Sequence, residues 1–578
     1  MSETPFISAR PSRLETSLPW ALGLAFLALL IIECALWHPG FSYLDEGNVV
    51  ALIQDWREGR ALPFELFKGS LHRELAAGLC LLWGPSLWVF RLVSAGALAL
   101  ECLLLYRLGT DFFGRKAAAW AVACCLVSAQ TFLRARSLLS FTLLPLELLA
   151  LMALSRRQWS QAGSFLFGAL AALLLADYEG AVLAVAVLAL SWFFQRDDER
   201  PRALGALLGF SAMLALLVYC SWEGLGDHLL RRVRSLPQEG LGPLKLMGQF
   251  LKSFLAGGNC IAYLGVSGRA FLPAWALPGF VAGAALAWKR QRVLLGWLAV
   301  GLLPALTVAG AAEPNRILAA WPAICLLGGL GIAWLAGRLG ALTLLILLLA
   351  GAAWEGSGYR ASMAADYGHW YGESAAMQRL AQRFADRRLV NELGPEYSSQ
   401  FRFLWPGPAA GSATSASALL APPLFVLTPE FAPGLGRDAA GLKFEGTGDS
   451  QPPLAYLAAA PPPLSARLER ISTELVELRH GLPRFAFRRH RDLLTSYLLS
   501  GTGDPWTRTA ALEEALSWSS GLGELRPELL RIALKDPLAS SSSLLWLSEQ
   551  ARRSGDSAFA ARLCARALQI DPRRPCGP

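Results

Sequence analysis

The stretch FSYLDEGNVVALIQDWREGR, from Phe41 to Arg60, sets the organisation expected for the whole chain. It follows an apolar run that ends at Trp37, opens with the acidic pair Asp45-Glu46, and continues as an amphipathic helical pattern. Two carboxylates just beyond a membrane span lie where water meets lipid, and acidic groups there are costly unless they have a function or a partner. A purely structural interpretation is that the pair caps the interfacial helix. From these residues alone, both interpretations stay open.

The composition of the whole chain is that of a polytopic membrane protein. The chain has 578 residues, of which 54% are hydrophobic and 17% are charged, and it contains several long uncharged apolar runs. Its net charge of +9 does not require nucleic acid as a partner, because much of the basic excess falls in short loops between spans. The first span has no small-residue cleavage signature, so we interpret it as a retained anchor.

The ten cysteines do not predict a metal centre. Most lie in or beside apolar runs without the spacing of a Cys/His site, and they are interpreted as small core residues. Cys564 and Cys576 could pair in an oxidising compartment. Carboxylates near a phosphate could still hold a divalent cation through oxygen ligands, so no metal ligand is assigned and the metal requirement stays open.

Eleven membrane spans are expected, each of about 17–22 residues. They fall near 19–37, 87–106, 117–134, 138–155, 162–177, 180–195, 203–222, 272–288, 293–311, 317–335 and 338–354.

If these spans alternate, the basic clusters all lie on one side, which is therefore predicted to be cytoplasmic. These clusters are Arg10 with Arg13, Arg107 with Arg115-Lys116, Arg156-Arg157, Arg196 with Arg200 and Arg202, Lys289-Arg290 with Arg292, and Arg338. The opposite, outer side then holds the carboxylates, together with the arginines that the preference of basic residues for the cytoplasmic side does not explain. It holds Asp45-Glu46, Arg134, Arg136, Asp177-Tyr178-Glu179, the segment 223–271, Glu313-Pro314-Asn315-Arg316 and everything after 355.

Four charged residues fall inside predicted spans: Glu33, Arg91, Glu101 and Glu147. Each is expensive in a membrane without a partner. Arg91 lies near the outer end of its span and is expected to snorkel to the interface. Glu101 and Glu147 lie deeper, where interhelical hydrogen bonding is favoured over catalysis.

The outer segment 223–271 contains an amphipathic stretch, Leu241 to Leu255, that carries Lys245 and Lys252. An interfacial helix on membrane lipid explains this pattern. A flank of a lateral entry for a lipid substrate explains it equally well.

After Trp354 no run is long enough to span a membrane. We predict a transmembrane domain over 1–354, an extracytoplasmic α/β region over 355–500 and a helical region over 501–578. The last segment fits half of a tetratricopeptide repeat, with Gly555, Ala560, Cys564, Ala567 and Pro572 at the small-residue and proline positions. A plain helical hairpin is an equal alternative, because one repeat cannot form a stable solenoid.

The charges of the outer face suit transfer chemistry on a phosphate-bearing lipid. A carboxylate can act as general base toward an acceptor hydroxyl or amine. Arginine suits a phosphate leaving group, because its planar fork binds phosphate oxygens and its charge is permanent.

Three motifs carry a resemblance to a known family. They are YLDEGNVVALIQDWREGRALP at 43–63, GPSLWVFRLVSAGALALECLLLYRLG at 84–109 and LPALTVAGAAEPNRILAAWPAICLL at 303–327. Together they resemble the GT-C superfamily of membrane glycosyltransferases, above all its protein O-mannosyltransferase and aminoarabinose-transferase groups, over most of residues 18–355. The resemblance implies a polytopic α-helical fold and an inverting transfer of a sugar from dolichyl or undecaprenyl phosphate to a glycan, lipid or protein acceptor.

The resemblance also implies roles for single residues. Asp45 is expected to be the catalytic base, with Glu46 as its neighbour in acceptor binding or charge tuning. Arg316 is expected to contact the polyprenyl phosphate, with Arg136 as a second phosphate contact. Further candidates for substrate contact are Arg134, Glu313, Tyr178 and Glu179.

The sequence departs from the family pattern at two places. Ser140 stands where many relatives carry an acidic residue, and Asp177-Tyr178-Glu179 stands where many carry a basic one. These departures leave the donor sugar open and leave room for an inactive relative.

Three functions therefore compete. The first is a glycosyltransferase at the outer face of a bacterial-type inner membrane. The second is a catalytically inactive scaffold on the same fold, whose helical C-terminal region binds a periplasmic protein partner. The third is a transporter, which is disfavoured because the charges gather at one face and no inverted repeat of broken spans is visible.

Overall fold

The computed structural model of the chain divides into two units, Met1–Leu225 with Arg232–Tyr371 and Gly226–Arg231 with Gly372–Pro578. Within them, the structure describes residues 13–37, 46, 70–84, 86–139, 141–157, 159–176, 203–235, 248, 251–252, 254–255, 266, 269–288, 291–307, 317–370, 372–384, 387, 389–391, 424–427, 443–445, 454–457, 463–470, 474, 487–503, 505–517, 522–536 and 541–570.

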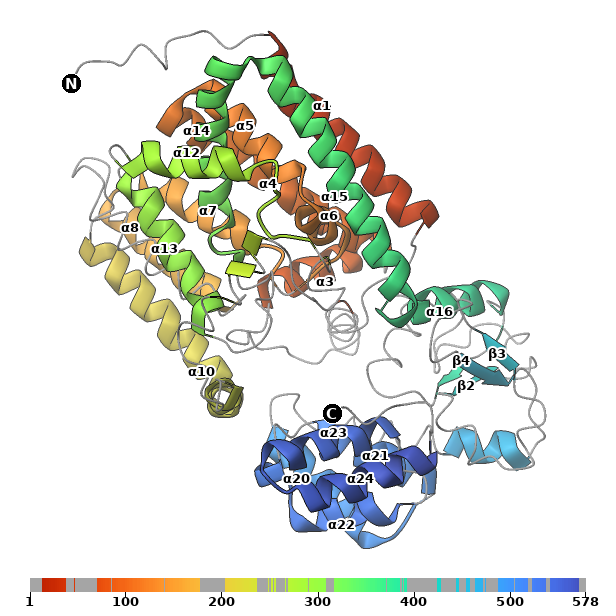
Figure 1. Ribbon diagram of the computed structural model, residues 1–578. Helices are drawn as coiled ribbons and strands as arrows, with labels where there is room; N and C mark the ends of the chain where they lie inside the picture. The colour runs from red at the N-terminus through yellow and green to blue at the C-terminus, as the bar shows by residue number, and fades with distance from the viewer. Residues whose placement is uncertain are drawn as a thin grey trace. The chain divides into compact units, whose positions relative to one another are not determined.

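The first unit is built of helices (Figure 1). They are α1 (Arg13–Ile32), the π-helical turn η1 (Glu33–Trp37), α3 (Ser70–Trp83), α4 (Leu87–Phe113), α5 (Arg115–Leu126), α6 (Ala129–Arg136), α7 (Leu144–Ser155), α8 (Gln161–Leu173), the 3-10 turn η2 (Leu174–Ala176), α10 (Ala203–Ser235), α12 (Leu277–Trp288), α13 (Arg292–Thr307), α14 (Trp321–Leu339) and α15 (Ala341–Trp370).

Several of these helices can cross a membrane. Four are long and apolar enough: Ser17–Leu36, Leu87–Phe113, Trp321–Leu339 and Leu342–Ala364. A fifth is the pair α5 and α6 if this bent pair is one span. Their leucines and tryptophans face outward in large number, as expected where lipid replaces water around a bundle. The chain is therefore a multi-pass membrane protein, while the predicted number of eleven spans stays a prediction.

Close crossings between helices depend on small residues. Helix α14 packs against both α12 and α5. A Cβ on Gly331 would overlap the carbonyl oxygen of Gly279, and a Cβ on Gly283 would overlap that of Leu327. Glycine at these positions lets the backbones of α12 and α14 approach, which is how membrane helices gain packing without a hydrophobic driving force.

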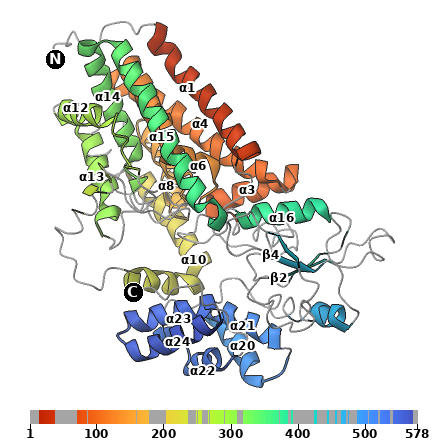
Figure 2. The same ribbon diagram turned by 45° about the vertical axis from the view of Figure 1, so that its right-hand side comes forward.

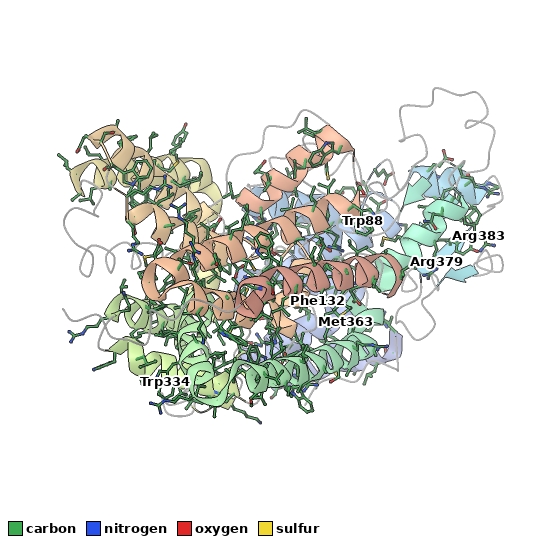
Figure 3. The ribbon with its side chains drawn as sticks, turned by 90° about the horizontal axis from the view of Figure 1, so that it is seen from above. Trp88, Phe132, Trp334, Met363, Arg379 and Arg383 are labelled. Atoms are coloured by element: carbon green, nitrogen blue, oxygen red, sulfur yellow. The ribbon has the colours of Figure 1, made fainter. Side chains whose placement is uncertain are left out.

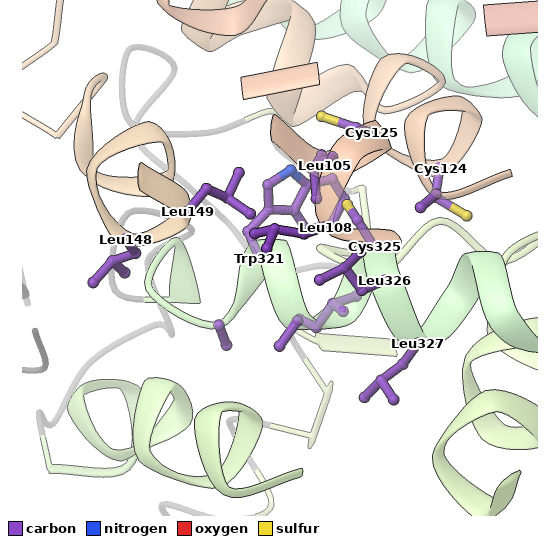
Figure 4. Packing of buried hydrophobic residues seen from close by; sticks show 14 of the residues in the cluster. Leu105, Leu108, Cys124, Cys125, Leu148, Leu149, Trp321, Cys325, Leu326 and Leu327 are labelled. Carbon is purple, nitrogen blue, oxygen red and sulfur yellow. The ribbon is translucent and has the colours of Figure 1, made fainter. Parts of the chain in front are cut away.

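The core of the bundle forms where α4, α5, α7 and α14 meet. Figure 4 shows Cys125 of α5 beside Leu105 and Leu108 of α4 and beside Trp321 and Cys325 of α14. All five side chains are buried. As the sequence indicates, these two cysteines are core residues, and both are free thiols.

The second unit contains a small sheet and a helical bundle (Figure 2). Its elements are α16 (Gly372–Arg383), β1 (Leu389–Asn391), β2 (Leu424–Leu427), β3 (Lys443–Glu445), β4 (Leu454–Leu457), α20 (Phe487–Ser500), α21 (Pro505–Ser517), the 3-10 turn η7 (Leu522–Glu524), α22 (Pro527–Lys535), α23 (Ser541–Arg553) and α24 (Ser557–Ile570).

The strands have the order β1-β2-β4-β3. Strand β1 pairs with β2 in parallel, and the other two pairs are antiparallel. Met377 and Leu380 of α16 pack on Leu424 and Val426, whose i, i+2 spacing directs both side chains to one face of the sheet. Arg379 and Arg383 of α16 are labelled in Figure 3.

The bundle of α20 to α24 ends in a helical hairpin, α23 and α24. Gly555 has a positive φ of 85° between the two helices, and Ala560 and Ala567 are buried against α23 and its neighbours. The hydroxyl of Ser548 donates to the carbonyl oxygen of Ala560 at 2.8 Å. Cys564 is disulfide-bonded, whereas Cys576 and Pro572 lie outside the described residues. The hairpin is compatible with both sequence interpretations, and the predicted domain boundaries stay predictions.

Candidate functional site

The site is organised around helix α6, which leaves the line of α5 at a bend of 68°. Helix α5 ends at Leu126, and the side chain of Ser128 accepts a hydrogen bond from the amide of Thr131 at 3.5 Å, as an N-cap does. Oε2 of Glu355, from α15, accepts the amide of Ala129 at 3.2 Å. Two of the amides left open by the break are thus satisfied by side chains, and the bent helix carries Arg134 and Arg136 in its last turn.

Arg134 pairs with a carboxylate from the middle of a span. Its Nη2 lies 2.6 Å from Oε2 of Glu101 on α4, and both side chains are buried. The thiol of Cys125 donates to the other carboxylate oxygen, Oε1, at 3.6 Å. The expectation that Glu101 serves interhelical hydrogen bonding is confirmed, since it joins α4 to α5 and α6.

Arg136 is fully buried beside Glu33, which begins the π-helical turn after α1. Its Nε lies 3.6 Å from Oε1 of Glu33. The same oxygen accepts a hydrogen bond of 2.6 Å from the hydroxyl of Tyr359 on α15. Glu33 therefore connects the end of α6 to both α1 and α15.

Glu46 brings the first outer loop to the same place. Both of its carboxylate oxygens bind the guanidinium of Arg91 on α4, Oε2 at 3.4 Å from Nη2. Its Oε1 also accepts the amide of Leu138, two residues after α6, at 2.8 Å. Glu46 and Arg91 are both buried. The expectation that Arg91 snorkels to the interface is wrong, because the loop supplies a carboxylate that binds it inside the protein.

Further contacts hold α6 along its length. The side chain of Gln130 bonds to both backbone groups of Val266, accepting its amide at 3.0 Å and donating to its carbonyl at 3.5 Å. The ring of Phe132 lies edge-on to Phe26 of α1 and to Tyr359 of α15, with centroids 5.2 Å and 5.0 Å apart. Figure 3 shows Phe132 beside Met363, with which it shares a small apolar cluster.

Among the described residues, three ion pairs lie in this cluster. Arg91, Arg134 and Arg136 each face a glutamate, and none of these six side chains is exposed. Burying such pairs is tolerable because each charge has a partner, whereas one charge left alone in this environment is severely destabilising.

The structure describes only part of the site expected from the sequence. Glu46, Arg134 and Arg136 are placed, and all three lie at or beside α6, while their roles in a site stay predictions. Sequence reasoning assigned no site role to Glu33, Arg91 and Glu101, although their charge inside a span was the indication that could have found them. Outside the described residues lie Asp45, Ser140, Asp177, Tyr178, Glu179, Glu313 and Arg316.

Within the part of the chain that the structure describes, no group of three or more His, Cys, Asp or Glu side chains could hold a metal ion.

Known proteins resemble this chain through structure rather than sequence. No family model and no curated protein matches the sequence. The fold is similar to ArnT from Cupriavidus metallidurans, bound to undecaprenyl phosphate, with a TM-score of 0.50 and 14% identity over 77% of this chain and 99% of ArnT. The apo form of ArnT matches with the same TM-score. A lower similarity, with a TM-score of 0.40 and 12% identity, links 73% of this chain to 70% of an oligosaccharyltransferase from Archaeoglobus fulgidus.

At this identity the similarity concerns the fold. It covers nearly the whole length of ArnT, so the predicted GT-C-like membrane fold is confirmed.

Proposed function

We propose that this protein is an inverting glycosyltransferase that moves a sugar from a polyprenyl-phosphate donor to an acceptor at the outer face of a bacterial-type inner membrane. The observation that supports it most is the bond from the amide of Leu138 to Glu46. This bond joins the first outer loop, which carries Asp45, to the end of α6, which carries Arg136. Glu46, the sequence neighbour of the candidate base, thereby contacts the end of the helix that carries a candidate phosphate ligand.

In the proposed reaction, Asp45 removes the proton from the acceptor hydroxyl or amine as that atom attacks the anomeric carbon of the sugar. The new bond forms on the face opposite the leaving group, so the configuration inverts. The bond from the anomeric carbon to the phosphate oxygen breaks, and the polyprenyl phosphate leaves with the electron pair. Arg316 and Arg136 are the proposed cations that stabilise its developing negative charge.

Glu46 is better suited to positioning than to proton transfer. Its carboxylate already binds the Arg91 guanidinium and the Leu138 amide. These bonds fix the orientation of the carboxylate relative to α4 and to the end of α6. We therefore assign Glu46 the role of fixing the loop that presents Asp45.

Arg134 has a similar supporting role in this proposal. Its hydrogen bond to Glu101 is short and buried, and the pair fixes α6 against α4. Contacts of Arg134, Glu313, Tyr178 and Glu179 with the substrate stay predictions.

The likeness to ArnT supports the lipid-phosphate part of the proposal. ArnT was solved with undecaprenyl phosphate bound, and this chain matches it over nearly its full length. A fold of this kind can therefore hold a polyprenyl phosphate. The fold does not identify the sugar or the acceptor class, whether glycan, lipid or protein, because these depend on individual side chains of the site.

The test is transfer of a labelled sugar from a polyprenyl-phosphate donor pool by membranes that contain the wild type, Asp45→Asn or the control Asp111→Asn. Asp111 is an exposed aspartate near the end of α4. We expect Asp45→Asn to abolish transfer at unchanged protein level and Asp111→Asn to retain it. Equal transfer by Asp45→Asn and the wild type would remove Asp45 from the mechanism. Absence of transfer by the wild type across donors would favour the scaffold with a partner-binding C-terminal region.

A further inference from the structure

Arg269 lies against the side of helix α15, although it belongs to the segment that precedes α12. Its guanidinium carbon is 4.1 Å from the centre of the Trp354 ring, and its Nη2 donates to the hydroxyl of Ser357 at 3.1 Å. A Cβ on Gly358 would overlap Nε of Arg269, so the absence of a side chain there lets the guanidinium lie against the helix. Three neighbouring positions of α15 thus hold one cation.

The protein leaves most of the hydrogen-bonding capacity of this guanidinium unused. Among the residues that the structure describes, Ser357 supplies the one side-chain acceptor to Arg269, whereas a guanidinium carries five N–H donors. The carboxylate of Glu355 attracts Arg269, but its hydrogen bond is with the amide of Ala129. Arg269 is half-buried, and Trp354 and Ser357 beside it are exposed. An acceptor from outside the protein can therefore reach the remaining donors.

The exposed face of α15 changes character at Trp354. The exposed large side chains that precede it are aliphatic, namely Leu342, Ile346, Leu347 and Leu349. The exposed residues that follow it include Ser357 and Arg360. Tryptophan is enriched where the hydrocarbon of a bilayer meets its headgroups. Arg269 therefore lies at the level of lipid headgroups, on a side of α15 that faces lipid.

We propose that Arg269, held by Trp354 and Ser357, binds the phosphate of a bilayer phospholipid. Arginine suits a phosphodiester, because its planar fork donates to phosphate oxygens and its charge is permanent. The acyl chains of the same lipid lie along the exposed aliphatic side chains of α15. This continuity favours a phospholipid over a soluble anion, which would gain nothing from an apolar surface.

The bound lipid stabilises a contact of helix α6. The amide of Arg269 donates to the carbonyl oxygen of Val266 at 3.3 Å. Val266 in turn binds the side chain of Gln130, in the first turn of α6, through both of its backbone groups. A lipid that fixes Arg269 on α15 thereby supports the start of α6. This role does not depend on sugar transfer, so the inference and the proposed function can fail separately.

The test is a titration of the purified full-length protein with phosphatidylglycerol, followed by native mass spectrometry. Arg269→Gln removes the charge and the fork, and we expect the affinity for the most tightly bound phosphatidylglycerol to fall roughly 10- to 100-fold, the effect of charge-assisted hydrogen bonds. The matched control is Arg338→Gln, at an exposed arginine of α14 that also lies over a tryptophan, Trp334, at 4.0 Å. An unchanged affinity in Arg269→Gln, or an equal loss in both variants, would overturn the site.

A second variant keeps the charge of Arg269 and removes its place on α15. Gly358→Ala puts a methyl group where Nε lies, so the guanidinium must leave Trp354 and Ser357. We expect the affinity for phosphatidylglycerol to fall as it does in Arg269→Gln. If Gly358→Ala binds the lipid like the wild type, the seating of Arg269 on α15 does not matter and the proposal is wrong.

Two further ligands distinguish the source of the phosphate. We expect Arg269→Gln to bind undecaprenyl phosphate like the wild type, and inorganic phosphate not to displace phosphatidylglycerol. Weaker binding of undecaprenyl phosphate by Arg269→Gln would assign Arg269 to the proposed donor instead. Displacement by inorganic phosphate would show that the acyl chains contribute nothing. Either result overturns the inference and leaves the proposed role of Asp45 untouched.

Discussion

The guanidinium of Arg134, at the end of a helix of eight residues, lies 2.6 Å from the carboxylate of Glu101 in the middle of α4. Both side chains are buried, and they stand 33 residues apart in the chain. Neither charge could remain at that place alone, since a charge without a partner is costly within a membrane bundle. The pair therefore ties the last turn of α6 to α4.

Removal of one member of this pair should be more damaging than removal of both. Arg134→Met leaves the Glu101 carboxylate buried without its partner, and we expect the protein to lose about 3–5 kcal/mol of stability. Glu101→Leu/Arg134→Met should recover most of this loss. Thermal unfolding in detergent measures both variants, with Arg115→Met at an exposed arginine as the control. A double variant less stable than Arg134→Met would contradict the pairing.

Arg91→Lys should reduce activity more than stability. Lysine retains the charge beside Glu46 but cannot bind both carboxylate oxygens with a rigid fork. The loop that carries Asp45 is then held less accurately, and displacement of a catalytic group by about 1 Å can cost roughly 100-fold in rate. We expect kcat to fall at least about tenfold with little change in the melting temperature. Arg107→Lys, at an exposed arginine of the same helix, is the control, and equal activity of both variants would argue against the positioning role.

Gly331→Leu should separate α12 from α14. A Cβ at Gly331 would overlap the Gly279 backbone, which cannot move aside as a flexible side chain can. Overpacking of this kind costs about 1–3 kcal/mol and occasionally more. Gly337→Leu on the same helix is the control, because a Cβ there meets nothing within 4 Å. If the two variants melt at the same temperature, the close crossing contributes nothing to stability.

The C-terminal bundle should depend on its buried leucines. Leu547→Ala on α23 removes a side chain that is 0% exposed, and we expect a local loss of about 2–5 kcal/mol. Hydrogen–deuterium exchange of full-length protein should show faster exchange over residues 541–570. Leu499→Ala, at a leucine that is 47% exposed, should leave the exchange unchanged. Equal exchange in both variants would mean that α23 and α24 are not packed on the other helices.

The predicted orientation can be read from cysteine labelling. Ser496→Cys in the helical bundle should react with a membrane-impermeant maleimide in intact spheroplasts, because the region after 355 is predicted to be extracytoplasmic. Arg157→Cys, in a predicted cytoplasmic cluster, should react only after permeabilisation. Both positions are exposed, so accessibility of the side chain is not limiting. The reverse pattern would invert the topology and place the proposed site on the cytoplasmic side.

The bend after α5 is a feature that the sequence did not predict. The hydropathy of 117–134 predicts one span, and the structure divides it into α5 and α6. Ser128 is a good N-cap residue and was a local indication of a new helix start. A polar residue inside an apolar run more often faces a neighbouring helix, so the sequence could not distinguish the two. Glu355, which binds the amide of Ala129, comes from a helix 226 residues further on.

What the sequence alone determined is the kind of protein, whereas the face at which its charges gather stays a prediction. Apolar runs indicate membrane spans directly, because the cost of transferring each type of residue from water to lipid does not depend on which helices lie beside it. The same reasoning marked Glu33, Arg91 and Glu101 as residues that need partners.

Only the tertiary structure decided which partners they have. Arg91 binds Glu46 from the preceding loop, Arg134 binds Glu101, and Glu33 receives both Arg136 and Tyr359. The energy of each pair depends on distances of a few ångströms between helices that are far apart in the chain. The sequence shows that burying each of these charges is costly. The packing of α1, α4, α6 and α15 decides which oppositely charged group compensates that cost.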